Sequence, residues 1–566
     1  MAGSRIGDVL VAAVPTWDGA GRRRALDDAG QPVGPVEEVP DLAAAVAARE
    51  RADSPRWLWP AAAEVYPGLL AAGVRVGRCH DLALVEAVLL GYAGQWGSPR
   101  SLAAGWARLH GLPVPDDPPP PSREMQPALF EPEPADLPGG ADPLDAAVAL
   151  YADQQRRAAT TEHPGRMRLL LAAESSGALV AAEMAHAGLP WSAARHDALL
   201  TGALGPRSAG GARPPRLADL AEQVRQAFGG RAVNPDSPAD LVRAFGREGI
   251  ELASARSYLL QQVDHPAVQP VLAYKELSRL HAAHGWSWLE AWVRDGRFRP
   301  EYVVGGVVSG RWATRGGGAL QIPRIVRRAV VADPGWALVV ADAGQLEPRV
   351  LAAVSHDPRM AEAAGAEDMY GALAEQAFDG DRARAKLGLL SAMYGGTSGG
   401  AAELLAVLRR RFPDAMRYVE AAARAGEEGR IVRTYLGRTC PPAGDRYWAA
   451  QSGAGLPEAG DAARRRATQV ARERGRFTRN FVIQGTAAEW ALVLLASLRR
   501  RLAGTAAELV FFQHDEVVVH CPAALAEEVA AAVGEAGDEA RRLLFGDTPV
   551  QFPLGTSVVD CYADAK

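Results

Sequence analysis

Short apolar runs alternate along the chain with longer Ala/Leu-rich stretches of helical periodicity. In residues 1–112 the runs Val9–Val14 and Trp57–Trp59 have the pattern of strands, and the stretches Asp41–Arg49 and Asp81–Leu90 have the pattern of helices. Because strands and helices alternate, this region is predicted to form an α/β domain.

Downstream of this region the pattern changes. Residues 113–140 contain ten prolines and almost no basic residue, which predicts an extended linker or surface loop. From Asp142 the periodicity is helical to about Leu200, and further helices run to about Arg294. Between them, Asn234-Pro-Asp-Ser-Pro238 predicts a turn and a helix start that the Asp or Ser side chain caps.

Two polar turns next to apolar runs stand out in the second half of the chain. The runs Leu509–Phe512 and Val517–Val519 flank Gln513-His514-Asp515-Glu516, which predicts a β-hairpin with a tight polar turn. Another apolar run, Trp336–Ala341, predicts a buried strand that ends in Asp342.

Acidic side chains at these two places suggest a metal site. The adjacent carboxylates of Asp515 and Glu516 repel each other, and a divalent cation relieves that repulsion. If the strand end lies beside the hairpin, Asp342 and Asp515 face each other and offer hard oxygen ligands to shared Mg²⁺ ions. Either aspartate alone is equally typical of a solvated turn.

Bulk composition narrows the class of protein. A chain of 566 residues is expected to form several domains, and 48% hydrophobic with 23% charged residues is ordinary for a globular protein. No apolar run is expected to span a membrane and no signal segment is recognised, which predicts a cytoplasmic protein without a membrane partner. The four cysteines have neither metal-ligand nor disulfide spacing. The net charge of −5 does not exclude a basic cleft for nucleic acid.

Lysine is scarce, since only Lys275, Lys386 and Lys566 occur among 62 basic residues. In so arginine-rich a chain, a retained lysine marks a place where a compact ammonium is wanted, although chance retention explains the terminal one.

Lys386 belongs to a predicted helix in which Arg382, Lys386, Leu390 and Tyr394 recur every four residues and share one face. That face is cationic, then apolar, then aromatic, which is the order of phosphates, sugar and base in a nucleoside triphosphate. An amphipathic helix with two solvated cations has the same pattern.

A second polar face is formed by Arg476, Asn480 and Gln484, again four residues apart. Such side chains can contact base edges and backbone of a duplex together, independently of sequence. An ordinary polar helix face is the alternative.

Taken together, these motifs resemble those of family A DNA polymerases, the DNA polymerase I type. The resemblance covers about residue 165 to the C-terminus and rests on motifs in the family's order: Asp342-x-x-Gln345-x-Glu347-x-Arg349, Arg382-x3-Lys386-x7-Tyr394-Gly395, Arg476-x3-Asn480-x3-Gln484-Gly485, His514-Asp515-Glu516, and the shorter Ser309-Gly-Arg311, Leu320-Gln321-Ile-Pro323 and Asn234-Pro-x-Ser-Pro238.

The resemblance implies an α+β multidomain fold: a right hand of palm, fingers and thumb behind an N-terminal ribonuclease-H-like α/β domain. The domains expected from it are a degenerate 3′–5′ exonuclease-like domain at 1–160 that includes the Pro-rich loop, a thumb at 161–308, a palm at 309–365 and 477–566, and fingers at 366–476.

It also implies roles for particular residues. Asp342, Asp515 and the Ala343 carbonyl would hold two Mg²⁺ ions, with Mn²⁺ as a substitute, and Glu516 and Lys386 would join the aspartates in catalysis. Deoxynucleoside triphosphate (dNTP) contacts would come from Arg382, Lys386, Leu390, Tyr394, Gln345, Glu347 and His514. Primer-template DNA contacts would come from Arg311, Gln321, Arg476, Asn480 and Gln484. The enzyme is expected to be a monomer.

Some positions depart from the family pattern. Leu390 stands where Phe or Tyr is usual, Ala343-Gly344 replaces Tyr-Ser, Pro348 replaces an aliphatic residue, and Tyr370 occupies a His position. We expect polymerase chemistry to survive these changes, because the metal ligands and the Arg/Lys pair are intact.

The proofreading activity is predicted to be lost. It needs Asp-x-Glu on the first strand, and no Asp-x-Glu occurs in residues 1–160. Helix capping or surface roles explain the scattered Asp81, Asp142 and Asp145.

Other functions stay open at this point. A phage-type RNA polymerase shares the Arg-x3-Lys-x7-Tyr-Gly spacing, but Glu347, Glu516 and the exonuclease-like N-terminus argue against it. A polymerase with residual 3′–5′ exonuclease activity, or a catalytically inactive DNA-binding scaffold, are further alternatives.

Overall fold

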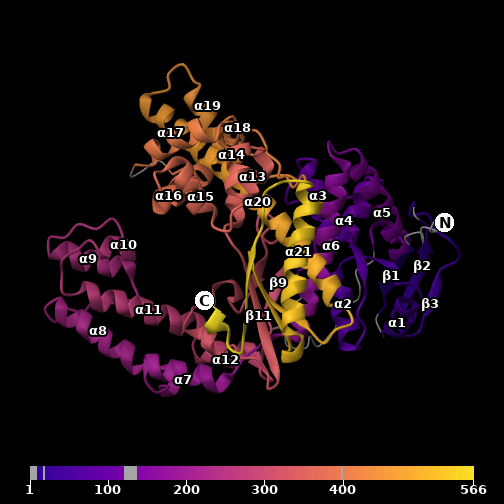
Figure 1. Ribbon diagram of the computed structural model, residues 1–566, viewed down its shortest axis with the longest axis horizontal. Helices are drawn as coiled ribbons and strands as arrows, with labels where there is room; N and C mark the ends of the chain where they lie inside the picture. The colour runs from indigo at the N-terminus through magenta and orange to yellow at the C-terminus, as the bar shows by residue number, and fades with distance from the viewer. Residues whose placement is uncertain (1–8, 17–18, 28, 120–136, 397–399, 566) are drawn as a thin grey trace.

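Three lobes surround a central antiparallel sheet in the computed structural model, which describes residues 9–16, 19–27, 29–119, 137–396 and 400–565 (Figure 1). An N-terminal lobe lies against one side of the sheet, a long helical arm extends from the other side, and a helical lobe rises above it. The molecule therefore has the expected right-hand shape beside an α/β domain. Most of the predicted Pro-rich loop, residues 120–136, lies outside the described residues.

The central sheet is the palm, and its strand order is β12-β13-β11-β14 with antiparallel neighbours throughout. Alternating side chains of β11 give it two buried faces: Val339 and Ala341 join the core that includes α20 and α21, whereas Leu338 and Val340 pack with residues at the base of the arm. The elements are β11 (Trp336–Ala343), β12 (Glu508–Gln513), β13 (Glu516–Pro522), β14 (Leu554–Val559), α13 (Leu346–Ser355), α20 (Asp461–Leu502) and α21 (Ala526–Phe545).

Helix α20 connects the palm with the upper lobe. It is continuous over 42 residues, and its second half is almost entirely buried. The expectation that no apolar run could span a membrane was wrong for this helix, which by length and composition is the one described helix that could. However, 83% of its apolar window is buried inside the structure, as in the core helix of a folded protein.

The upper lobe is the fingers, and the predicted helix with Arg382 and Lys386 is confirmed as α16, capped by Asp381. Its helices are α14 (Pro358–Ala363), α15 (Met369–Ala377), α16 (Arg382–Tyr394), α17 (Ala401–Arg411), α18 (Pro413–Glu427) and α19 (Asp445–Ala454).

The arm is the thumb. As predicted, a helix begins after Asn234-Pro-Asp-Ser-Pro238, where the Ser237 side chain accepts a hydrogen bond from the Asp240 amide. The arm contains α7 (Ala193–Leu204), α8 (Pro215–Ala227), α9 (Pro238–Arg247), α10 (Ser257–Leu260), α11 (Val268–His284) and α12 (Trp286–Trp292), and at its base lie β6 (Leu189–Pro190), β7 (Val293–Arg294), β8 (Arg297–Phe298), β9 (Glu301–Val303) and β10 (Ala313–Arg315).

The N-terminal lobe has a five-stranded sheet in the order β3-β2-β1-β4-β5, with an antiparallel first half and parallel β1, β4 and β5. The expected strands and helices of residues 1–112 are all present. The elements are β1 (Leu10–Pro15), β2 (Gly21–Leu26), β3 (Glu37–Val39), β4 (Arg56–Trp59), β5 (Arg78–Asp81), α1 (Leu42–Asp53), α2 (Ala62–Ala71), α3 (Leu82–Tyr92), α4 (Leu102–His110), α5 (Pro143–Ala159) and α6 (Pro164–Ala187).

The domain limits given by the sequence stay predictions, and two of them cut through structure. Helix α6, assigned to the thumb, packs in the body against α2, β5, α20 and β12. The limit at 476/477 falls inside α20. All four cysteines are buried and free, in agreement with their spacing.

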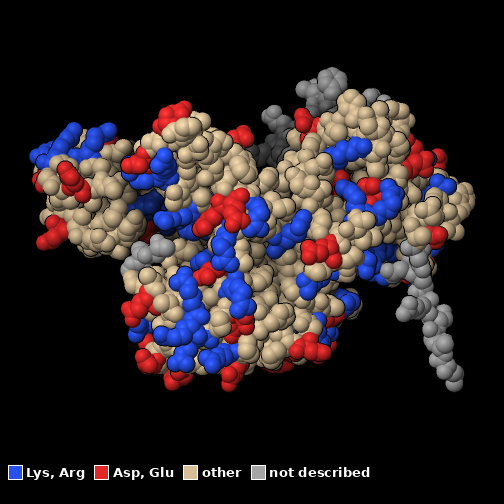
Figure 2. Space-filling model, turned by 90° about the horizontal axis from the view of Figure 1, so that it is seen from above, with Lys and Arg blue, Asp and Glu red and all other residues tan. Residues whose placement is uncertain are grey.

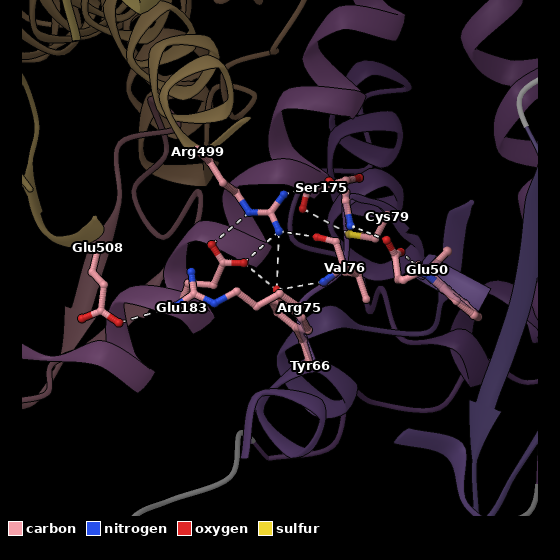
Figure 3. Close-up of polar contacts among 11 residues, drawn as sticks. Glu50, Tyr66, Arg75, Val76, Cys79, Ser175, Glu183, Arg499 and Glu508 are labelled. Atoms are coloured by element: carbon pink, nitrogen blue, oxygen red, sulfur yellow. Dashed lines mark hydrogen bonds and ion pairs between the residues drawn. The ribbon is translucent and has the colours of Figure 1, made fainter. Parts of the chain in front are cut away.

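A buried ion pair joins the N-terminal lobe to the palm (Figure 3). From the C-terminal end of α20, Arg499 contacts the Glu183 carboxylate of α6 at 2.8 Å and the Gly77 carbonyl at 2.8 Å. The Tyr66 hydroxyl donates a hydrogen bond to the Glu183 carboxylate. Burial together with Glu183 raises the pKa of Tyr66. The side chains of Arg499 and Glu183 are only 13% and 12% exposed, so the pair is a structural connection between lobes.

Arg499→Ala is expected to destabilise the protein by about 3 kcal/mol or more, because it leaves the Glu183 carboxylate buried without its partner. Urea unfolding and limited proteolysis of the N-terminal lobe would measure this. The adjacent Arg500, whose side chain is 65% exposed and pairs with Glu539, is the matched control. Arg500→Ala should cost less than about 1 kcal/mol. Equal losses in the two variants would contradict the structural role of the Arg499 pair.

Candidate functional site

The structure brings Asp342 and Asp515 together at one end of the palm sheet. Asp342 lies opposite Glu516 in the β11–β13 register, and the Ala343 amide donates to the Asp515 carbonyl at 2.9 Å. The hairpin turn is two residues, with His514 in a left-handed conformation at φ 60°. Such a turn matches the twist of the flanking strands, so Asp515 is held at a defined place beside the end of β11.

Next to the hairpin is a cleft of about 280 Å³ between palm and fingers. Both lobes contribute to its walls, and seven of the residues predicted for the site line it: Arg311, Gln345, Glu347, Leu390, Tyr394, His514 and Asp515. Tyr370 and Pro348 line it too. Burial and the nearby Arg311 lower the pKa of His514.

Glu347 connects the two walls of this cleft. From the first turn of α13, its carboxylate pairs with Arg311 and accepts a hydrogen bond from the hydroxyl of Tyr394 at the end of α16. Burial, then the bond to Glu347, raises the pKa of Tyr394. Arg311, expected along a DNA duplex, lies in the cleft wall.

Asp368 contacts Gln345 of the cleft wall and was given no role by the sequence. Its carboxylate accepts from Arg382 at 2.7 Å and from Gln345 at 2.8 Å. The Arg382 guanidinium, followed by the Gln345 bond, lowers the pKa of Asp368 to about 2. Arg382 thus has an anionic partner before any ligand arrives.

Lys386 differs from Arg382 in this respect. One turn further along α16, its side chain is exposed and makes no hydrogen bond or ion pair with a described residue. An anion reaching this face of α16 would meet the ammonium without displacing a protein partner.

Arg349 supports the palm side of the cleft from below. It is fully buried, and its guanidinium donates to five backbone carbonyls, those of Gly344, Ala364, Ala366, Glu367 and Gln551. Burial lowers its pKa. These bonds tie the turn after β11 to the loop that carries Asp368 and to the segment before β14. The periodicity of the sequence could not identify this structural role of Arg349.

Glu516 lies behind the hairpin rather than in the cleft. Its carboxylate is buried, accepts from the Tyr562 hydroxyl and lies 3.6 Å from Arg327. These contacts support the hairpin, and the catalytic role expected for Glu516 stays a prediction.

The predicted face of α20 is present as one helical surface. Arg476 is exposed and Asn480 and Gln484 are half-buried, while Gln321 is exposed at the end of a short helix outside the cleft. Gly485 lets α20 approach its neighbours, since a Cβ there would lie 2.4 Å from Thr434 Cγ2 and 3.1 Å from the Ser309 carbonyl.

Gly310 of the Ser309-Gly-Arg311 motif has a similar role. It has φ 86°, and a Cβ there would lie 2.3 Å from Arg438 Nε. Gly485 therefore lets α20 approach the Ser309 and Thr434 segments, and Gly310 lets the loop that carries Arg311 approach Arg438.

The scattered acids of the N-terminal lobe have local partners. Asp81 is buried and caps α3. Asp142 caps α5 and pairs with Arg22 of β2. Asp145 lies 3.4 Å from Arg24 of the same strand. On β1, Val11 and Ala13 are apolar and buried. The described residues contain no cluster of three or more His, Cys, Asp or Glu placed to hold a metal.

The chain is similar to known proteins over its second half and as a whole fold. A model of DNA polymerase family A matches residues 213–557. DNA polymerase I of Chloroflexus aurantiacus is 28% identical over 355 residues, which cover 54% of this chain and 35% of that protein. The thermostable DNA polymerase I of Thermus thermophilus is 29% identical over 319 residues, covering 51% of this chain and 36% of that protein.

Among solved structures, the POL domain of Pol1 from M. smegmatis, in complex with a DNA primer-template and dNTP, matches with a TM-score of 0.70. The sequences are 21% identical, and the match covers 99% of this chain and 96% of that chain, so the shared fold extends through the N-terminal lobe. The chain spans about a third of the length of the curated relatives it matches.

Glu489, one turn beyond Gly485, predicts a pH dependence of stability. It is fully buried and accepts from Thr434 and from the Leu436 amide, and burial raises its pKa to about 7. Below about pH 4.5 the carboxyl is protonated in both folded and unfolded chains. As the pH rises towards 7 the unfolded chain releases its proton first, so about 3 kcal/mol of stability is lost.

Glu489→Gln should remove this loss. Urea unfolding at pH 5 and pH 8 would compare the two proteins, and the variant should gain on the wild type as the pH rises. The same pH dependence in both would show that the buried carboxyl does not titrate as expected.

Proposed function

The chain belongs to DNA polymerase family A, and we propose that it extends a DNA primer by template-directed addition of dNTPs. The observation that carries the proposal is the meeting of Asp342 and Asp515 at the end of the palm sheet, beside a cleft that Asp515 lines together with Leu390 and Tyr394 of α16. Arg382 and Lys386 belong to the first half of the same helix. Acidic groups of the palm and basic groups of this helix suit a reaction between a primer hydroxyl and a triphosphate.

The donor set fits Mg²⁺. Two carboxylates and the neighbouring Ala343 carbonyl are hard oxygen ligands, and Mg²⁺ usually keeps waters and binds substrate phosphates besides one or two carboxylates. When bound, two such ions, or Mn²⁺ in their place, would lower the pKa of the primer 3′-hydroxyl and offset charge on the leaving pyrophosphate. Asp342 and Asp515 would hold them with the Ala343 carbonyl.

In the proposed reaction the 3′-oxygen forms a bond to the α-phosphorus while the bond to the β-phosphate oxygen breaks. Lys386 would contact the triphosphate and can give its proton to the leaving group. Arg382 would exchange Asp368 for the phosphates. Leu390 and Tyr394 would lie under sugar and base, and Glu347, held by Tyr394 and Arg311, would close the space beside the sugar C2′.

Primer-template duplex is proposed to lie between the thumb and the palm. Gln321, Arg476, Asn480 and Gln484 would contact it from the palm side. Basic side chains also gather at the tip of the arm, at the left of Figure 2. Arg231, Arg243 and Arg247 of the thumb are exposed. A cytoplasmic, monomeric enzyme stays a prediction.

The N-terminal lobe is proposed to be a scaffold without 3′–5′ exonuclease activity. Two-metal hydrolysis of DNA needs several carboxylates that converge on one place. Here Asp81 and Asp142 cap helices, Asp142 and Asp145 face arginines of β2, and β1 offers apolar side chains.

Primer extension tests the polymerase proposal. Asp342→Ala and Asp515→Ala should each lower the rate about a thousandfold or more, because metal ligands supply several kcal/mol of transition-state stabilisation. DNA affinity should change little. If the wild-type protein were as inactive as these variants, the polymerase proposal would be refuted and a catalytically inactive DNA-binding scaffold would be the remaining interpretation.

Lys386→Ala separates the triphosphate role from DNA binding in the same assay. It should raise the KM for dNTP about tenfold or more while primer-template affinity is retained, as loss of one charge-assisted contact predicts. If dNTP use and primer-template affinity were weakened to the same extent, the role of Lys386 would be contradicted. Comparison of dNTP with ribonucleotide incorporation on one template tests the RNA polymerase alternative.

A primer with a mismatched 3′ end tests the scaffold proposal. With Mg²⁺ and no dNTP, the wild type is expected to leave the primer intact. Degradation that disappears in an Asp81→Ala/Asp145→Ala variant, but not in Asp342→Ala, would establish a residual exonuclease in the N-terminal lobe.

A further inference from the structure

A second cavity, of about 310 Å³, lies where the N-terminal lobe, the palm and the fingers meet. It is here called the junction pocket. Its lining includes Tyr92 at the end of α3, Arg166 in the first turn of α6, His356 directly after α13, Tyr418 of α18 and Arg433 of the segment after α18. Its volume is at the lower end of the range of small-molecule sites.

Helix α13 separates the junction pocket from the cleft beside Asp515. Glu347, in the first turn of this helix, lines the cleft, whereas Val354 near its end and His356 line the junction pocket. The 10 residues of α13 rise ~15 Å. The two sites therefore lie at opposite ends of one helix, and a small molecule in the junction pocket would leave the cleft open.

The junction pocket is cationic. Among the described residues no carboxylate pairs with Arg166 or Arg433, and Arg166 makes no hydrogen bond. The Arg166 guanidinium lies 3.8 Å from the ring centroid of Tyr435, and that of Arg433 lies 4.2 Å from the ring centroid of Tyr92. Such stacking orients a guanidinium and leaves N–H groups at its edge for an anion. Glu162, the one acid among the lining residues, is exposed.

An aromatic surface lies in the same pocket. Among the described residues, the ring of Tyr418 has no aromatic or cation–π partner, and its hydroxyl makes no hydrogen bond. Burial, then Glu489, raises the pKa of Tyr418 to about 12, so the hydroxyl stays a donor at neutral pH. Helix α6 begins here at Pro164, and no described side chain caps its first turn. Its N-terminal amides add to the attraction for an anion.

We propose that the junction pocket binds a nucleoside mono- or diphosphate, with its phosphates on Arg166 and Arg433 and its base against Tyr418. The two guanidinium groups alone would suit any small oxyanion. The unpartnered aromatic ring beside them favours an anion that carries a flat ring system, because bases stack on such side chains whatever their identity. This site is additional to the proposed polymerase reaction and does not depend on it.

The position of the pocket gives its occupancy a consequence for the fold. A ligand that contacts Arg166 of α6 and Tyr418 of the fingers would connect the body of the molecule to the fingers. Because it would bind only the folded chain, it would stabilise the protein by mass action.

The test is isothermal titration calorimetry of the full chain with AMP, ADP and inorganic phosphate. Divalent cations are left out, so that nucleotides do not enter the proposed polymerase site with a metal ion. One pocket variant is R166Q/R433Q, which keeps the side-chain stems over the tyrosines, and the other is Y418L, which keeps an apolar side chain. The controls are K386A for the cleft and R168Q/R424Q, two exposed arginines of α6 and α18 outside the pocket. Thermal unfolding checks that each variant is folded.

The wild type and both controls are expected to bind AMP and ADP with the same affinity. R166Q/R433Q should bind them at least about a hundredfold more weakly, because two charge-assisted contacts are lost. Y418L should bind them about tenfold more weakly, and its weaker binding of inorganic phosphate should equal that of the wild type. AMP at a hundred times its Kd should raise the Tm of the wild type by about 2 °C and leave that of R166Q/R433Q unchanged.

Other results would overturn the inference. Binding that is lost in K386A and kept in R166Q/R433Q would assign the nucleotide to the cleft. Equal losses in R168Q/R424Q and R166Q/R433Q would indicate a general effect of charge. If inorganic phosphate bound as tightly as AMP, and Y418L changed neither, the pocket would be a phosphate site and not a nucleotide site. A folded wild type that binds no AMP or ADP up to about 1 mM would remove the pocket as a nucleotide site.

Discussion

The geometry of the palm depends on one buried arginine. Among the described residues no carboxylate pairs with Arg349, and its charge is stabilised by five carbonyl dipoles from three separate segments of the chain. A guanidinium can satisfy so many acceptors because it has five N–H donors in a fixed plane. Its bonds hold the turn after β11 against the loop before α15 and the chain before β14, and so they fix where Asp342, Glu347 and Asp368 stand.

Helix α20 connects the palm with the other lobes of the molecule. At its C-terminal end Arg499 anchors the N-terminal lobe, in its middle Gly485 touches the Ser309 and Thr434 segments, and its outer half carries the exposed Arg476. One continuous helix of 42 residues thus passes through fingers and palm. Movement of the fingers relative to the palm must either bend this helix or leave it in place and occur in the smaller helices around it.

Much of the local structure could be predicted from the sequence. Strands such as β11 and the β12–β13 hairpin have short β-branched and aromatic runs with polar ends, and α16 has a cap and a regular four-residue repeat. That Asp342 and Asp515 meet was inferred from their chemistry and from the family resemblance, since pairing between strands more than 150 residues apart leaves no mark in local periodicity.

Other features could not be predicted because they depend on tertiary contacts. Asp368 has no motif of its own and acquires its partners only when α15, α16 and the turn at Gln345 come together. Helix α6 has the same pattern as a thumb helix, and its place in the body follows from what packs around it. The apolar half of α20 has the length and composition of a membrane span. It is apolar because it is buried inside the structure.

If Arg382 binds the triphosphate as proposed, the bridge from Asp368 to Arg382 and Gln345 makes nucleotide entry an ion exchange. Arg382 already has a counter-ion, so a triphosphate would gain only the difference between its own attraction and that of the carboxylate it displaces. The same exchange would break the bridge between Arg382 of the fingers and Gln345 of the palm. Nucleotide binding would thereby be coupled to a contact between two lobes.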